Sequence, residues 1–143
     1  MNQAPLPQAP PPQQALEVAL YAEDLERCAA FYEHVIGLRR GPEVPGRHVF
    51  FRLGEGMLLL FNPAASERPT DNPAMPVPPH GARGPGHLCF AAERSAIAAW
   101  KARLQAAGIA IEAEFDWPNG ARSLYLRDPA GNSIEFAEPG LWR

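Results

Sequence analysis

The sequence predicts an α+β fold in which one βαβββ module occurs twice. The order of a strand, a helix and further strands begins near Ala15 and starts again near Gly86, about 70 residues later. Each copy contains one helix, and one helix can cover only one face of a sheet. The other face of each sheet is therefore free to line a site.

The first module is expected to span residues 15–63. Apolar residues alternate with others in ALEVALYA, as in a half-buried strand. DLERCAAFYEHVIGL has helical spacing, with Asp24 suited to the N-cap and Gly37 to the end of the helix. A hairpin that turns between Gly54 and Gly56 follows. The three segments cover residues 15–22, 24–38 and 47–63.

The second module is expected to span residues 86–139. GHLCFAAE predicts its first strand, and SAIAAWKARLQAAGI predicts a helix capped by Ser95 and ended by Gly108. Three more strands follow, and the turn DPAGN, which contains Gly131, separates the last two. These three strands lie within residues 109–115 and 121–139.

Two proline-rich segments lie outside the modules. Residues 1–14 are rich in proline and glutamine and carry no charge, so we expect a disordered tail before a single domain at 15–143. Residues 64–85 lack periodicity, and with Pro63 they hold seven prolines. They are expected to form a long loop that joins the modules.

The composition excludes several classes of function. The 143 residues have a net charge of -3 and a pI near 5.8, so no basic surface for nucleic acid or anionic membranes is expected. No apolar run is long enough to cross a membrane. Cys28 and Cys89 form no CxxC pair, which fits a cytoplasmic protein with reduced thiols. The class of partner that is not excluded is a small molecule.

The polar candidate residues have the same parity along their predicted strands, so their side chains lie on the same face. When the two copies are superposed, Glu17 lies opposite His87 and Leu59 lies opposite Glu135, always on the face away from the helices. Other side chains with this parity make the expected surface partly apolar, as in most small-molecule pockets. They are Tyr21, Met57, Phe61, Cys89, Ser123 and Tyr125.

EVALYAEDLERCAAFYEHVIGL, GHLCFA and SLYLRDPAGNSIEFAEPGLW resemble the vicinal oxygen chelate superfamily, the glyoxalase, bleomycin-resistance and extradiol dioxygenase superfamily. The resemblance spans about residues 15–142. It implies that the mixed sheets of the two βαβββ modules curve into a cup-shaped site. It also implies a divalent metal held by Glu17, His87 and Glu135, with Glu135 and Glu17 as catalytic residues. Leu59 cannot bind a metal, and members with glyoxalase I activity carry a carboxylate at that position. The resemblance therefore argues against glyoxalase I itself.

Two classes of function follow from the resemblance. One is a metal-dependent lyase, isomerase or dioxygenase acting on a small molecule with vicinal oxygens. The other is a metal-free protein that sequesters a drug, as bleomycin-resistance proteins do. The three candidate ligands suit Zn, Mn, Fe, Ni or Mg and do not select among them. Edge strands and a half-open cup favour a homodimer.

Six further side chains are candidates, each with an alternative role. Tyr125 and Phe61 contact substrate or pack on the sheet. Cys89 lines the substrate site or acts as a small buried apolar residue. Trp117 covers the site or anchors its turn, and Arg122 binds a substrate anion or is a solvated charge. His80 is a loop residue or a proton carrier at the edge of the cup.

Overall fold

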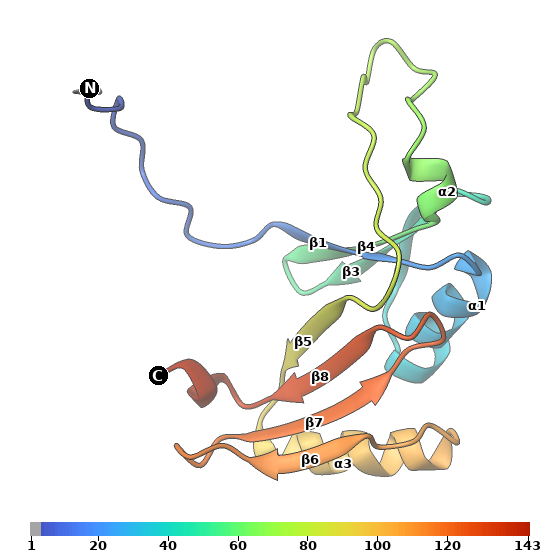
Figure 1. The fold of residues 1–143 in the computed structure, drawn as a ribbon. Helices are drawn as coiled ribbons and strands as arrows, with labels where there is room; N and C mark the ends of the chain where they lie inside the picture. The colour runs from blue at the N-terminus through green and yellow to red at the C-terminus, as the bar shows by residue number, and fades with distance from the viewer. Residues whose placement is uncertain (1–3) are drawn as a thin grey trace.

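The computed structural model describes residues 4–143 and confirms the α+β fold of two modules (Figure 1). Each module contributes one four-stranded sheet, with strand orders β1-β4-β3-β2 and β5-β8-β7-β6. The first sheet consists of β1 (Glu17–Tyr21), β2 (Arg40–Val44), β3 (His48–Leu53) and β4 (Gly56–Phe61). The second consists of β5 (His87–Ala91), β6 (Ala113–Asp116), β7 (Arg122–Arg127) and β8 (Ser133–Ala137).

The two sheets have the same internal pairing. The first strand of each module pairs in parallel with the last, β1 with β4 and β5 with β8. All other neighbouring strands are antiparallel. The hairpin predicted between Gly54 and Gly56 is present, whereas β2 was not located by the sequence pattern. A register shift between Arg40 and Glu43 interrupts that strand and weakens its alternation.

One long helix covers each sheet. In the first module α1 (Leu25–Ala30) continues into a π-helical stretch, η1 (Phe31–Ile36), and Gly37 follows with a φ of 83°. Asp24 caps α1 as predicted by accepting a hydrogen bond from the Arg27 amide. The helix of the second module is α3 (Arg94–Ala106). Its predicted cap, Ser95, is wrong, because Glu93 occupies the cap position and makes no side-chain capping bond.

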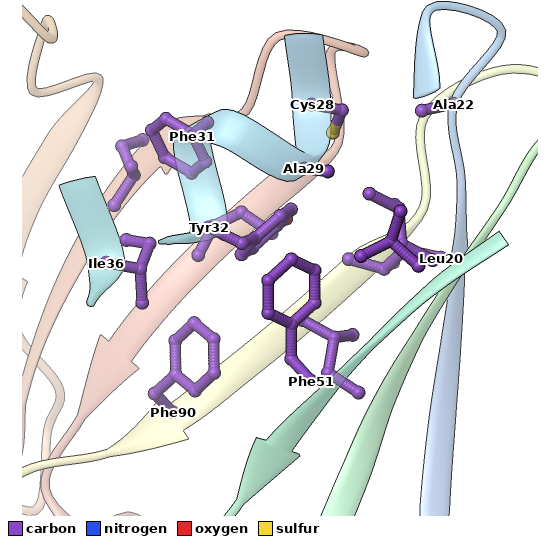
Figure 2. Packing of buried hydrophobic residues seen from close by; sticks show 14 of the residues in the cluster. Leu20, Ala22, Cys28, Ala29, Phe31, Tyr32, Ile36, Phe51 and Phe90 are labelled. Atoms are coloured by element: carbon purple, nitrogen blue, oxygen red, sulfur yellow. The ribbon is translucent and has the colours of Figure 1, made fainter. Parts of the chain in front are cut away.

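The helices and the helix-facing side chains of both sheets form one hydrophobic core. Figure 2 shows Tyr32 of η1 between Phe31 of the same helix and Phe51 of the first sheet, with Phe90 of the second sheet nearby. The Tyr32 and Phe51 rings lie 6.1 Å apart. The modules therefore pack against each other through the side of the sheets that carries the helices.

A buried carboxylate also joins the modules. Asp128, in the turn between β7 and β8, accepts a hydrogen bond from the Tyr32 hydroxyl of the first module at 2.6 Å. Asn132 donates to the same oxygen at 2.9 Å. Burial and the neighbouring Asp128 raise the pKa of Tyr32 far above its usual range, so its hydroxyl remains a donor. The tyrosine thus couples η1 to the turn that sets the register of β8.

Residues between β4 and β5 are mostly irregular. They begin with α2 (Pro63–Ser66), a single helical turn that the sequence pattern did not predict. Residues 4–14 form no helix or strand and extend away from the sheets (Figure 1), and the first three residues of the predicted tail lie outside the described part of the chain. Within residues 4–143, no helix combines the length and apolar character needed to span a membrane.

Candidate functional site

The strand registers of the two modules can be compared residue by residue. Glu17 pairs with Met57 and Ala19 with Leu59 in the first module. His87 pairs with Ser133 and Cys89 with Glu135 in the second. Glu17 is therefore equivalent to His87, and Leu59 to Glu135, as the sequence predicts. We call the surfaces that carry these residues, away from the helices, the first-module face and the second-module face.

Glu135 is the centre of the second-module face. It lies in the middle of β8, and only 4% of its surface is exposed. The fully buried Ser123 donates its hydroxyl hydrogen to Glu135 Oε1 at 2.6 Å. Ser123 Oγ in turn accepts the indole N–H of Trp117 at 2.7 Å. An indole nitrogen only donates, so the serine hydrogen is directed to the carboxylate.

His87 lies next to this carboxylate. Its Nδ1 is 2.9 Å from the Ser133 carbonyl oxygen, and its Nε2 is 3.2 Å from Glu135 Oε2. Since a carbonyl only accepts, Nδ1 carries the hydrogen, and Nε2 of a neutral imidazole then presents a lone pair to the carboxylate. Two acceptors at this distance need a proton or a cation between them. A ring N–H bonded to a backbone carbonyl is also the usual second contact of a metal-binding histidine.

Aromatic and sulfur groups surround the pair. The Tyr125 ring is stacked with His87 at 6.3 Å and with Phe115 at 5.9 Å. Burial and the adjacent Glu135 carboxylate raise the pKa of Tyr125 to about 12. Desolvation and Glu135 likewise raise the pKa of Cys89 to about 12. Both groups are therefore neutral at pH 7, and Cys89 is not poised as a nucleophile.

The predicted metal ligands are only partly assembled in one chain. His87 and Glu135 lie together, whereas Glu17 is exposed at the start of β1. Across residues 4–143, no three His, Cys, Asp or Glu side chains are grouped so that they could hold a metal ion. Within one chain, two of the three candidates therefore lie together and the third does not.

The other predicted residues divide between the two faces. Trp117, Cys89 and Tyr125 all belong to the surroundings of Glu135. Phe61 lies on the first-module face, 7% exposed, against Tyr21, His48, Phe50 and His80.

Arg122 is engaged elsewhere. It has the opposite strand parity to Ser123 and Tyr125, and its guanidinium pairs with Asp116 at 2.9 and 3.1 Å. That contact raises the pKa of Arg122. The structure therefore keeps this cation within a surface ion pair and does not group it with Glu135.

Three contacts were not foreseen from the sequence. The role of Ser123 as the donor to Glu135 could be anticipated only from its parity on β7. Phe115 stacks on Tyr125, but β6 is too short for a clear alternation. His80 Nδ1 lies 2.7 Å from the Tyr21 hydroxyl, a contact between residues 59 positions apart. No local pattern predicts a bond of that kind.

Comparison with known proteins identifies the family. Residues 14–136 match the family described as the Glyoxalase/Bleomycin resistance protein/Dioxygenase superfamily. The chain belongs to this superfamily. Its members bind small-molecule substrates, often form dimers and generally use a divalent metal.

Individual relatives agree with this assignment. A crystal structure of lactoylglutathione lyase from Agrobacterium tumefaciens is 48% identical, covers 93% of this chain and 98% of its own, and has a TM-score of 0.88. The uncharacterized protein PA2024 of Pseudomonas aeruginosa is 30% identical over 128 residues, which is 84% of each chain. The fosfomycin resistance protein FosX from Mesorhizobium loti shows a shared fold, with a TM-score of 0.61. It is 18% identical, and the match covers 91% of this chain and 94% of its own.

Proposed function

We propose that the protein is a metal-dependent enzyme of the lyase or isomerase type that acts on a small molecule with vicinal oxygens. The observation that carries the proposal is the pairing of His87 with Glu135 on the second-module face. A buried carboxylate and an imidazole converge there at 3.2 Å, and neither of the facing atoms carries a hydrogen when the ring is neutral. The similarity to a lactoylglutathione lyase, at 48% identity, supports a lyase of this superfamily. We do not extend it to that enzyme's own reaction, which is glyoxalase I, because of Leu59.

In this proposal His87 Nε2 and Glu135 Oε2 hold the ion. Ser123 occupies Oε1, so Oε2 is the oxygen free to meet a ligand or to accept a proton from it. When bound, a divalent ion would polarise substrate oxygens and stabilise the negative charge that develops on them. The neutral Tyr125 hydroxyl lies beside the same carboxylate and is suited to donate a hydrogen bond to a substrate oxygen.

We further propose that Glu17 completes the ligand set from a second copy of the chain. Glu17 is the counterpart of His87 in the first module, and it is exposed rather than paired with the other two candidates. A homodimer that brings the first-module face of one copy to the second-module face of the other would supply it. Light scattering tests this part, and a monomer at high micromolar concentration would contradict it.

Glyoxalase I activity itself is not part of the proposal. Leu59 occupies the position equivalent to Glu135, it is 8% exposed, and its side chain can neither bind a metal nor accept a proton. We therefore expect the protein to be weak or inactive in a glyoxalase I assay. Activity comparable to that of established glyoxalase I enzymes would show that the leucine does not limit the reaction.

Metal analysis tests the proposal most directly. The protein is purified without added ions or chelators, and its metal content is measured. The metal-free form is then titrated with Mn²⁺ in a calorimeter, alongside the His87→Ala variant. We expect bound metal in the wild type and clearly weaker binding in the variant. A wild-type protein that neither contains nor binds a divalent ion would refute the metal-dependent function.

One observation favours a second candidate, the metal-free sequestration of an aromatic compound. The first-module face is lined by rings: His48 and Phe50 are stacked at 4.1 Å, and His80 meets Phe61 at 4.4 Å. Such a surface can bind an aromatic ligand by stacking. Tight binding of aromatic compounds by metal-free protein, together with no Mn²⁺ binding, would select this candidate.

A further inference from the structure

We infer that Ser123 and Trp117 are positioning residues that fix the Glu135 carboxylate for its ligand. This inference rests on the proposed function, because the ligand considered is the divalent ion of that site. Neither residue is proposed to touch the ion or the substrate. Each acts through Glu135: when one carboxylate oxygen is held by a hydrogen bond, the orientation of the other oxygen is fixed.

The hydrogen bonds in this chain have only one possible direction. Trp117 Nε1 donates to Ser123 Oγ at 2.7 Å, and the serine hydroxyl donates to Glu135 Oε1 at 2.6 Å. A serine hydroxyl has one hydrogen, so accepting from the indole leaves that hydrogen for the carboxylate. Oε1 must then be an acceptor. The chain therefore holds Oε1 in place and leaves Oε2 directed toward His87.

Burial makes this arrangement rigid. Ser123 is 0% exposed and Glu135 is 4% exposed, so water cannot replace the serine hydroxyl if it is removed. A buried carboxylate that loses this donor is free to rotate, and the rotation weakens its hold on a cation. Hydrogen-bonded partners of metal-binding carboxylates typically change metal affinity about 10–100-fold when they are removed.

The turn that carries Trp117 is itself tied down. The Trp117 amide donates to the Ala121 carbonyl at 2.8 Å, and the Gly120 amide donates to the Trp117 carbonyl at 2.8 Å. The Asn119 side chain reaches the carbonyls of Gly140 and Leu141 in η2 (Pro139–Trp142) at 3.2 and 3.1 Å. The last residues of the chain thus help to hold the indole that orients Ser123. This geometry favours the anchoring role of Trp117 over the covering role.

Two variants and one matched control test the inference by calorimetric titration of metal-free protein with Mn²⁺. Ser123→Ala removes the direct donor, and we expect it to bind Mn²⁺ about 10–100-fold more weakly. Trp117→Phe removes only the indole N–H, so we expect a smaller loss in the same direction. Ser66→Ala is the control, because Ser66 is also 0% exposed, and its hydroxyl has no hydrogen-bond partner within residues 4–143. It should bind Mn²⁺ like the wild type.

A second measurement tests the hydrogen-bonded chain without metal. The three tryptophans give three indole N–H signals in a nuclear magnetic resonance spectrum, and Trp117→Phe identifies one of them. We expect this signal to exchange with solvent more slowly than that of Trp142, which is 90% exposed, and to exchange faster in Ser123→Ala. Equal Mn²⁺ affinity in Ser123→Ala and Ser66→Ala would overturn the inference alone. A wild type that binds no Mn²⁺ would overturn the inference and the proposed function together.

Discussion

The first-module face and the second-module face have the same strand arrangement but different side chains. Their registers superpose, yet the central position is Leu59 in one and Glu135 in the other. The neighbouring strand gives a second contrast, because His48 and Ser123 are equivalent by register. Ser123 donates to Glu135, whereas His48 Nδ1 is buried without a partner among the described residues. One face is built around a carboxylate, and the other around stacked rings.

This difference separates two roles: the strand pairing determines where side chains lie, and the residue types determine the chemistry of each face. The repeated pairing of strands presents equivalent residues on the same side of each sheet, whatever their type. A carboxylate at the central position is buried together with a donor, as buried charges require. The leucine at the equivalent position needs no donor, and rings occupy the surrounding positions. The two faces therefore offer different chemical groups at equivalent positions.

The largest expected effect is a loss of unfolding free energy on truncating a core residue, and it should be equal in the two modules. Leu58 and Ile134 occupy equivalent helix-facing positions, and both are 0% exposed. Replacing either by alanine leaves a cavity in the shared core, so we expect a loss of about 2–5 kcal/mol in unfolding free energy. Urea denaturation of both variants measures it. A large loss in one module and a negligible one in the other would mean that the core is not shared as described.

Two tyrosine variants compare a buried contact with a partly exposed one. Tyr32→Phe removes a donor to buried Asp128, so we expect a loss of about 1.5–3 kcal/mol in unfolding free energy. Tyr21→Phe removes the contact with His80 on the first-module face, which is only part-buried, and should lose about 1 kcal/mol or less. Thermal and urea melts decide between them. The reverse order would mean that Asp128 does not join the modules.

Metal affinity should depend on the second-module face. Glu135→Gln keeps the size of the side chain and removes its charge, so we expect Mn²⁺ binding to weaken by more than the about 10–100-fold expected for Ser123→Ala. Glu112→Gln is the matched control, since this exposed carboxylate pairs with Arg127. Calorimetric titration of both variants measures the difference. Equal affinities would remove Glu135 from the proposed site.

Glu17→Gln refines that comparison. If the first-module face of a second copy completes the site, this variant should also bind Mn²⁺ more weakly, although less so than Glu135→Gln. The same titration measures it, and Glu112→Gln again serves as the control. Unchanged affinity in Glu17→Gln would show that the second-module face binds the ion without the first.

The smallest expected effect concerns pH and the first-module face. Burial lowers the pKa of His48 below its usual value, so the folded state binds fewer protons than the unfolded state in this range. The contribution of neutral His48 to the unfolding free energy is therefore complete above the pKa of the residue in the unfolded state, about 6.5. It is lost as the pH falls from there toward the lower pKa of the folded state. His48→Phe should therefore lose less stability than the wild type between about pH 7 and about pH 5.5. Urea midpoints at both values provide the test, and identical losses would contradict it.

Much of the fold follows from local pattern. Strand alternation in β1, β5 and β8 and the two hairpin turns were enough to predict which face carries Glu17, His87 and Glu135, because a turn of fixed length fixes register. The bond from Trp117 to Ser123 was not predictable, since it depends on the conformation of the turn at residues 117–121. Whether Glu17 approaches His87 depends on how whole modules are arranged, which no local pattern records. Of the two roles considered for Arg122, its ion pair with Asp116 and its parity opposite to Ser123 agree with the surface charge.

The parallel pairing of the first and last strand in each module has a consequence for how the chain folds during synthesis. β1 has no partner until β4, ending at Phe61, has left the ribosome, and β5 similarly waits for β8, ending at Ala137. Each sheet can therefore form only when its own module is complete, and the first can form before the second is made. Pairing distant segments is slower than forming hairpins. The hairpins β3–β4 and β7–β8 should therefore form first, and β1 and β5 should pair with them afterwards. A chain that has emerged only as far as the segment between Phe61 and His87 is expected to hold one finished sheet and its helix, with a core that still lacks the side chains of the second module. That interval is therefore the time of greatest risk for aggregation.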